Sequence, residues 1–276
     1  MKNRSVFAAS DPAGTDAATA ATREQARRIE QASLRAWPAL SDSDFDGWRL
    51  RFADGYTRRA NSITPLEPSR LALQDKITTC ERLYAERGLP TIFRLTPFAP
   101  AELDELLAAR GYRSGDRVEV RARVFATVPP LPPRHVSGRL RGHGVDSWLD
   151  IFERLSNASP SNRAAHRAVL TAVPGRRRLL ALAVDDQPVA CGMGVLTESR
   201  LGLFDLVTSP LHRNRGYGSE LLRRALLWGE QAGAAEAYLQ VLERNATAKR
   251  IYDRLSFQLI YRYHYREKAI SPLRRA

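Results

Sequence analysis

The most constraining stretch of this 276-residue chain is a strand pattern, a glycine-containing turn and a helix pattern between residues 203 and 231. The strand pattern consists of Leu203, Phe204, Leu206 and Val207. The turn reads Arg213-Asn214-Arg215-Gly216-Tyr217-Gly218, and apolar residues then recur at helical spacing as far as Trp228. A helix that begins at such a turn presents free backbone N–H groups at its positive end. The stretch therefore predicts a phosphate-binding site.

The glycine spacing excludes two common phosphate-binding loops. A dinucleotide-binding G-x-G-x-x-G needs a different glycine pattern within a βαβ unit, followed by an acidic residue. A P-loop needs Gly-Lys followed by Ser or Thr, and the residues after Gly218 are Ser219 and Glu220. What remains is Arg-x-x-Gly-x-Gly, whose glycines at 216 and 218 allow the backbone to approach phosphates closely.

A second pattern follows at a short distance. Gly233 ends the helix, and residues 237–242 read as a strand. Asn245 then precedes a short helical segment that carries Tyr252, and the segment closes with Leu255-Ser256-Phe257.

Together the two patterns resemble the signatures of the GCN5-related N-acetyltransferases (GNATs), in which a Gly-Phe usually stands where Ser256-Phe257 stands here. The resemblance implies an α/β (α+β) fold, with a mixed, mostly antiparallel sheet flanked by helices. It also implies acetyl-coenzyme A (acetyl-CoA) as acyl donor, held by main-chain N–H groups of the glycine turn.

The resemblance carries over to individual residues. Asn245 matches the residue that contacts the pantetheine arm, although an Asn there would also cap the following helix. The expected cofactor-binding residues are Leu206, Val207, Thr208, Arg213, Asn214, Arg215, Gly216, Tyr217, Gly218, Ser219 and Asn245.

Three residues are candidates for proton transfer. Tyr252 matches the family's tyrosine that protonates the coenzyme A thiolate, and a phenol suits that task; a core-facing aromatic on a short helix is the alternative. Asp205 is a carboxylate inside an apolar strand, which is costly to bury without a purpose, so it is a candidate general base. A surface Asp paired with an arginine is the alternative. His264, in the last strand pattern, is a rival base because of its near-neutral reference pKa.

Substrate recognition is less defined. Arg58, Arg59 and Asn61 could face a groove and bind a carboxylate-bearing amine, since arginine suits that group. A solvated hairpin is the alternative. No cysteine lies in the signature regions, so we expect direct attack of the amine on the thioester in a ternary complex.

The chain order predicts two related halves. Helices are expected at 16–37, 70–87, 101–110, 146–155 and 161–172, and strands at 47–52, 56–63, 91–95, 118–128, 179–184, 189–196, 200–208 and 259–266. Residues 1–20 read as a flexible leader, 21–128 as a degenerate GNAT-like domain, 129–134 as a proline-rich linker and 135–268 as the acetyltransferase domain. This organisation resembles bacterial tandem GNAT proteins.

Composition narrows the function further. The formal net charge is +13, but the arginines are scattered and no DNA- or RNA-binding motif accompanies them, so nucleic acid is not the expected partner. No apolar run reaches the length of a membrane span. Cys80 and Cys191 lie far apart in sequence, as in a cytoplasmic protein without disulfides. We expect no metal, and a monomer or homodimer.

The sequence thus predicts an acetyl-CoA-dependent N-acetyltransferase acting on a primary amine of a small molecule or peptide. Two alternatives stay open: a longer acyl-CoA as donor, or a non-catalytic acyl-CoA sensor.

Overall fold

The protein is described by a computed structural model that covers residues 12–128 and 136–270. The helices are α1 (Pro12–Ala36), α2 (Leu73–Ala85), α3 (Leu103–Ala109), α4 (Val145–Ser156), α5 (Arg163–Ala172), α6 (Tyr217–Gln231) and α7 (Ala246–Arg254). The strands are β1 (Ser41–Phe45), β2 (Trp48–Phe52), β3 (Ile63–Pro65), β4 (Thr91–Leu95), β5 (Arg113–Val124), β6 (Arg139–Gly142), β7 (Arg176–Val184), β8 (Gln187–Thr197), β9 (Arg200–Thr208), β10 (Glu236–Leu242) and β11 (Gln258–Lys268).

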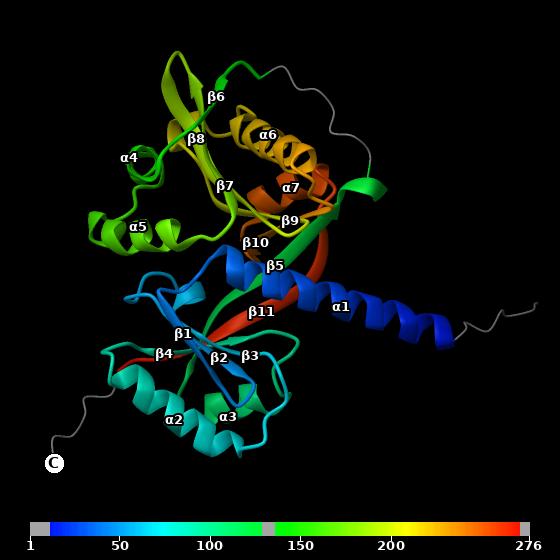
Figure 1. The fold of residues 1–276 in the computed structure, drawn as a ribbon, viewed down its shortest axis with the longest axis vertical. Helices are drawn as coiled ribbons and strands as arrows, with labels where there is room; N and C mark the ends of the chain where they lie inside the picture. Colours follow the sequence, from blue (N-terminus) through cyan, green and yellow to red (C-terminus); the bar gives the residue numbers. More distant parts are fainter. Residues whose placement is uncertain (1–11, 129–135, 271–276) are drawn as a thin grey trace, which may run out of the picture.

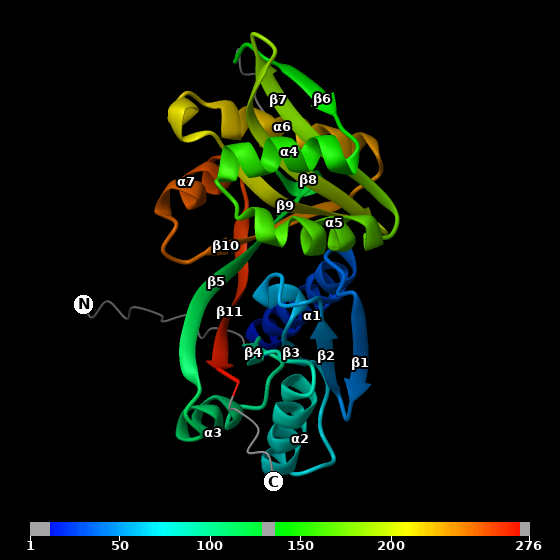
Figure 2. The ribbon, with the colours of Figure 1, turned by 90° about the vertical axis from the view of Figure 1, so that its left-hand side faces the viewer.

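All of these strands belong to one sheet, in the order β1-β2-β3-β4-β11-β5-β10-β9-β8-β7-β6. Neighbouring strands are antiparallel except for the pairs β3–β4 and β9–β10. The expected mixed, mostly antiparallel sheet is therefore confirmed. Long strands β5 and β11 run between an upper group of strands, β6 to β10, and a lower group, β1 to β4 (Figures 1 and 2).

The helices cover both faces of the sheet. In the upper group, α4 and α5 lie on one face, and α6 and α7 lie on the other (Figure 1). The first face, which α1 also covers, packs around Trp37, Trp148 and Phe204, and the second around Leu226 and Phe257. In the lower group, α2 and α3 enclose a third cluster around Trp48 and Phe93. Amphipathic helices thus bury their apolar sides against a twisted sheet, which is what the helical spacing predicts.

Strand β5 joins the two halves of the sequence. It comes from the first half, yet it pairs with β10 on one side and β11 on the other. Strand β4 likewise pairs with β11, the last strand in chain order. The sheet therefore continues without a break across the two expected domains. The expected linker 129–134 lies outside the described residues.

Most expected elements are confirmed, with four corrections. The segment 56–63 was expected as the returning strand of a hairpin, but Arg58–Ala60 form a 3₁₀ turn and the strand begins only at Ile63. The reason is Asn61, whose side chain accepts hydrogen bonds from the Ala53 and Gly55 N–H groups and donates to the Tyr56 carbonyl.

The other three corrections concern strands β1 and β6 and the leader. Neither strand was predicted, because each is a short, polar edge strand without apolar alternation. Residues 12–20 of the expected leader belong to α1. None of the helices within residues 12–128 and 136–270 has the length and apolar character needed to cross a bilayer.

A buried ion pair fixes α1 to the centre of the sheet. Glu30 on α1 and Arg94 on β4 are each 1% exposed. Both guanidinium Nη atoms of Arg94 contact the Glu30 carboxylate, and Nη2 lies 3.0 Å from Oε2. The Tyr261 hydroxyl on β11 donates to the same carboxylate at 2.5 Å. Burial of the Tyr261 phenol and the adjacent Glu30 charge raise its pKa well above the ordinary value.

We expect Glu30→Leu to lower the free energy of unfolding by about 3–5 kcal/mol, because it leaves the Arg94 charge buried without a partner. The double variant Glu30→Leu/Arg94→Leu should recover most of that loss, since it removes both charges together. Urea unfolding of the two variants and the wild type measures the difference. A single variant within 1 kcal/mol of wild type would contradict the prediction.

Candidate active site

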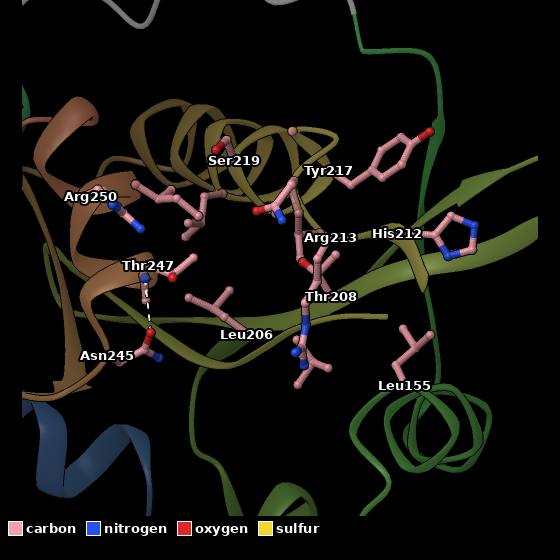
Figure 3. A pocket seen from close by; sticks show the side chains of 18 of the residues that line it. Leu155, Leu206, Thr208, His212, Arg213, Tyr217, Ser219, Asn245, Thr247 and Arg250 are labelled. Atoms are coloured by element: carbon pink, nitrogen blue, oxygen red, sulfur yellow. Dashed lines mark hydrogen bonds between the residues drawn. The ribbon is translucent and has the colours of Figure 1, made fainter. Parts of the chain in front are cut away.

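A cavity of about 870 Å³ lies where the end of β9, the turn after it, α6 and α7 meet. Side chains reach it from several directions: Leu206 and Thr208 come from β9, Ser219 from α6, and Asn245, Thr247 and Arg250 from the α7 side (Figure 3). Of the expected cofactor-binding residues, ten line the cavity: Leu206, Val207, Thr208, Arg213, Asn214, Gly216, Tyr217, Gly218, Ser219 and Asn245. Arg215 belongs to the turn but not to the lining.

The two glycines of the turn have different physical tasks. Gly216 has φ +86°, a left-handed conformation that favours glycine, and it directly precedes α6. At Gly218 a Cβ atom would lie 2.8 Å from the Thr208 hydroxyl oxygen, so a side chain there would fill the space between turn and strand. The first intrahelical bond runs from Glu220 N–H to the Gly216 carbonyl. The N–H groups of residues 217–219 therefore have no partner within the helix, and they lie at its positive end.

The strand beside the turn has one open edge. Strand β9 pairs with β10 only from Arg200 to Leu203, although β10 continues to Leu242. Its other edge remains paired with β8 as far as Thr208. The backbone of residues 206–208 is thus free to pair with an extended ligand on the side where β9 and β10 diverge.

Two residues of α7 have the positions that the sequence predicts. The Asn245 side chain accepts a hydrogen bond from the Ala248 N–H at 3.1 Å, so Asn245 caps α7 while it also lines the cavity. Tyr252 lines the same cavity and is 7% exposed. Burial raises the pKa of its phenol to about 12, opposed by the charge of Arg121. The phenol is therefore a proton donor at neutral pH.

The last residue of the α7 motif is also explained. Ser256, which stands where the resemblance has a glycine, has φ +61°. Its N–H donates to the Asp253 carbonyl at 3.0 Å. The turn thus keeps the left-handed conformation with a serine in place of the glycine.

Asp205 occupies an irregular point of β9. Between Phe204 and Val207 the register with β8 shifts, and Asp205 has φ +50°. Its Oδ2 lies 3.0 Å from Nε2 of His166 on α5. Sequence reasoning missed His166, because nothing in the amphipathic pattern of residues 163–172 distinguishes it from an ordinary core residue.

His264 lies elsewhere. It pairs with Leu95 of β4 and Arg117 of β5, and its Nε2 lies 2.8 Å from Asp104 on α3. Arg266 and then His264 lower the pKa of Asp104 to about 2. His264 is not among the residues that line the cavity, so the structure does not bring this rival base together with Tyr252.

The three candidate substrate residues separate in the same way. Arg58 forms ion pairs with Asp116 and Glu267, each at 2.9 Å. Asn61 is 3% exposed and serves the loop described above. Only Arg59 lies near the irregular point of β9: its guanidinium is 5.5 Å from the Phe204 ring and 5.3 Å from that of Trp37.

Three further basic residues line the cavity: His212, Arg250 and Arg254. The positively charged residues of α7 were not predicted as ligands, because basic residues are frequent throughout this chain and carry no signal singly. Their positions give the cavity a positive lining suited to a phosphorylated ligand. In the part of the chain that the structure describes, no three His, Cys, Asp or Glu side chains are grouped as metal ligands.

Comparison with known proteins identifies the family. The family model described as "Probable histone acetyltransferase Rv0428c C-terminal" matches residues 23–266. The "Uncharacterized N-acetyltransferase YobR" of Bacillus subtilis (strain 168) is 25% identical over 244 residues, which cover 88% of this chain and 98% of the relative.

Solved structures show the same fold. A GCN5-related N-acetyltransferase from Kribbella flavida aligns with a TM-score of 0.68 at 16% identity, over 90% of this chain and 96% of its own. A "Tandem GNAT protein from the clavulanic acid biosynthesis pathway (without AcCoA)" aligns with a TM-score of 0.58 at 12% identity, over 72% and 70% of the two chains. The chain belongs to the Rv0428c C-terminal acetyltransferase family, within the GCN5-related N-acetyltransferase superfamily, and is an N-acetyltransferase.

Proposed function

We propose that the protein transfers the acetyl group of acetyl-CoA to a primary amine of a small molecule or peptide, by direct attack in a ternary complex. The observation that carries this proposal is the cavity itself. It combines the free N–H groups at the start of α6, the Gly218 cradle and the open edge of residues 206–208. A diphosphate is bound by free N–H groups at a helix start, and an extended amide-containing arm pairs with an open strand edge.

Each residue then has a role that its position allows. The N–H groups of residues 217–219 bind the diphosphate, with Arg213 and Arg250 supplying positive charge, and the β9 edge and Asn245 hold the pantetheine arm. The amine nitrogen attacks the thioester carbonyl and loses a proton to Asp205. The C–S bond breaks, and the Tyr252 phenol protonates the departing thiolate.

The state of the cysteines supports direct attack. Cys80 and Cys191 are both fully buried, and burial raises the pKa of each thiol well above its ordinary value. A buried, protonated thiol is a poor nucleophile, so neither cysteine suits an acyl-enzyme intermediate.

The same proposal covers the organisation of the chain. Residues 21–128 form a degenerate GNAT-like half, 129–134 a linker and 135–268 the half that carries the site. All of the cavity-lining residues fall between Leu155 and Arg254, which supports this division of labour. We further propose that the protein works in the bacterial cytoplasm as a monomer or homodimer.

The cofactor site is tested first, by calorimetry with acetyl-CoA on the wild type and on the double variant Gly216→Glu/Gly218→Glu. A carboxylate about 4 Å from a phosphate costs roughly 4 kcal/mol at an effective dielectric constant of about 20. We therefore expect the variant to lose at least about 100-fold in affinity. Gly142→Glu, at an open position on β6, is the matched control for an added charge. A folded wild type that does not bind acetyl-CoA would contradict the proposal.

Turnover is tested with Tyr252→Phe. We expect kcat to fall by about 100-fold, since the proton donor for the thiolate is lost, while acetyl-CoA affinity stays unchanged. Thiol release is measured with Nα-acetyl-lysine amide, spermidine and tyramine as acceptor probes. Tyr238→Phe is the matched control, because the buried Tyr238 hydroxyl has no hydrogen-bond partner in the described structure.

The pH dependence follows from the same phenol. Its pKa is raised, so Tyr252 stays protonated from neutral pH up to about pH 11, and its ionisation should limit turnover only above that.

A non-catalytic sensor would bind acetyl-CoA but release no thiol with any probe, and Tyr252→Phe would leave its binding unchanged.

A further inference from the structure

The irregular point of β9 places an acidic side chain where the sheet opens. Asp205 adopts a left-handed backbone conformation within a strand, at the site where one extra residue disrupts pairing with β8. Such bulges re-aim a side chain and are frequent beside active sites. The bulge follows directly after Leu203, the last residue that β9 pairs with β10. The point where the sheet opens, after Leu203, and the Asp205 carboxylate are thus two residues apart in the chain.

His166 holds this carboxylate from a closed aromatic pocket. The imidazole is 3% exposed, while the Asp205 side chain retains 18% exposure. Tyr56 stacks on the imidazole with ring centroids 4.9 Å apart, and Phe152 meets it edge-on at 5.0 Å. Trp37 and Trp148 complete the enclosure, each at 5.9 Å. The ring therefore cannot turn away, and Asp205 is the accessible member of the pair.

Other ionisable groups near the pair come from three elements. Tyr56 lies in the loop before the 3₁₀ turn Arg58–Ala60, and burial followed by the Asp205 charge raises its pKa. Burial and the Asp205 charge also raise the pKa of the Cys191 thiol on β8. The charge of Arg59 acts in the opposite direction and lowers the pKa of Tyr56. On α5 itself, Arg163 and Arg167 are occupied by Glu153 and Asp146. His166 is therefore the one group that hydrogen-bonds Asp205 in the described structure.

The position of Asp205 relative to the cavity suits an incoming amine. Leu206 packs with the α6 side of the sheet, whereas Phe204 and Val207 pack with the α4 and α5 side. Leu206 and Val207 both line the cavity. Asp205 contacts α5, so it faces away from the cofactor loop. An amine that approaches the thioester through the gap between β9 and β10, from the face opposite the cofactor, meets this carboxylate.

We propose that His166 is a positioning residue that holds Asp205 as the proton acceptor for the amine, on the acceptor side of the opened sheet. This inference rests on the proposed acetyl transfer. In the step, the N–C bond forms as the amine proton passes to an Asp205 oxygen, and the C–S bond breaks as the thiolate takes a proton from Tyr252. Charge and protons balance without a further reactant.

Two variants of His166 separate positioning from packing. His166→Phe keeps an aromatic ring in the enclosure but removes the hydrogen bond, whereas His166→Gln keeps a donor near the position of Nε2. The measurement is kcat/KM at pH 7 for whichever of Nα-acetyl-lysine amide, spermidine or tyramine turns over, with calorimetric acetyl-CoA binding and thermal unfolding on each variant.

We expect His166→Phe to lower kcat/KM at pH 7 by about 10- to 100-fold and Asp205→Asn by about 100-fold or more. His166→Gln should restore most of the rate. Acetyl-CoA affinity should be unchanged in all three variants.

Several outcomes would overturn the inference. One is a folded His166→Phe protein with the wild-type rate. If His166→Phe does not fold, the test passes to His166→Gln. A folded His166→Gln protein that is as slow as Asp205→Asn would then overturn the inference. A loss of rate in His264→Gln with none in His166→Phe would point to the His264–Asp104 pair instead. A wild type that binds no acetyl-CoA refutes the proposed function itself, which separates the two failures.

Discussion

The insertion of β5 between β10 and β11 is the constraint on which the candidate active site depends. Strand β5 carries Arg121 and Arg123, whose guanidinium groups donate to the carbonyls of Phe257 at 3.2 Å and Leu255 at 2.7 Å. These carbonyls lie just beyond the carboxyl end of α7, where positive charge is stabilising. The first half of the sequence therefore anchors the helix that carries Tyr252, although it contributes no residue to the lining of the cavity.

A second consequence of this arrangement is the opening of the sheet. With β5 and β11 on one side and β8 on the other, β10 and β9 are each held by outer neighbours and pair with each other over only a few residues. The unpaired backbone that results would be costly if it were buried without a partner. Here the backbone of residues 206–208 instead faces the cavity next to the start of α6. The position of the cavity thus follows from strand pairing, and the glycine turn places the free N–H groups at the start of α6 beside it.

The site was predictable from the sequence where its parts lie close together in the chain. Gly216, Gly218, Asn245 and Tyr252 belong to local patterns whose spacing fixes a turn or a helix face, and each lies on the cavity. His166 was not predictable, because its partner Asp205 is brought to it only by the packing of α5 on the sheet. The loop around Asn61 was misread as a strand since side-chain hydrogen bonds to the backbone override an extended pattern.

The fold shows the same difference: elements set by neighbouring residues were predictable, and pairings between distant residues were not. Helices and central strands followed their apolar periodicity, whereas the pairing of β4 and β5 with β11 depends on residues more than a hundred positions apart. No spacing within either half indicates such pairing. His264 illustrates the difference: its near-neutral reference pKa made it a rival base, but only the structure showed that it contacts Asp104 on α3.

The pairing of β4 and β5 with β11 also has a consequence for how the chain is made. Strand β11 follows every other described strand in chain order, and β4 otherwise touches the sheet only through the single pair Ile63–Phe93. During synthesis from the amino terminus, the first half therefore waits with unpaired strand edges until residues 258–268 have left the ribosome. A chain truncated before β11 would keep Arg121 and Arg123 on β5, but β4 and β5 would lack the strand that lies between them. Among the described strands, β1 to β4 are therefore joined to the rest of the sheet only after β11 has been made.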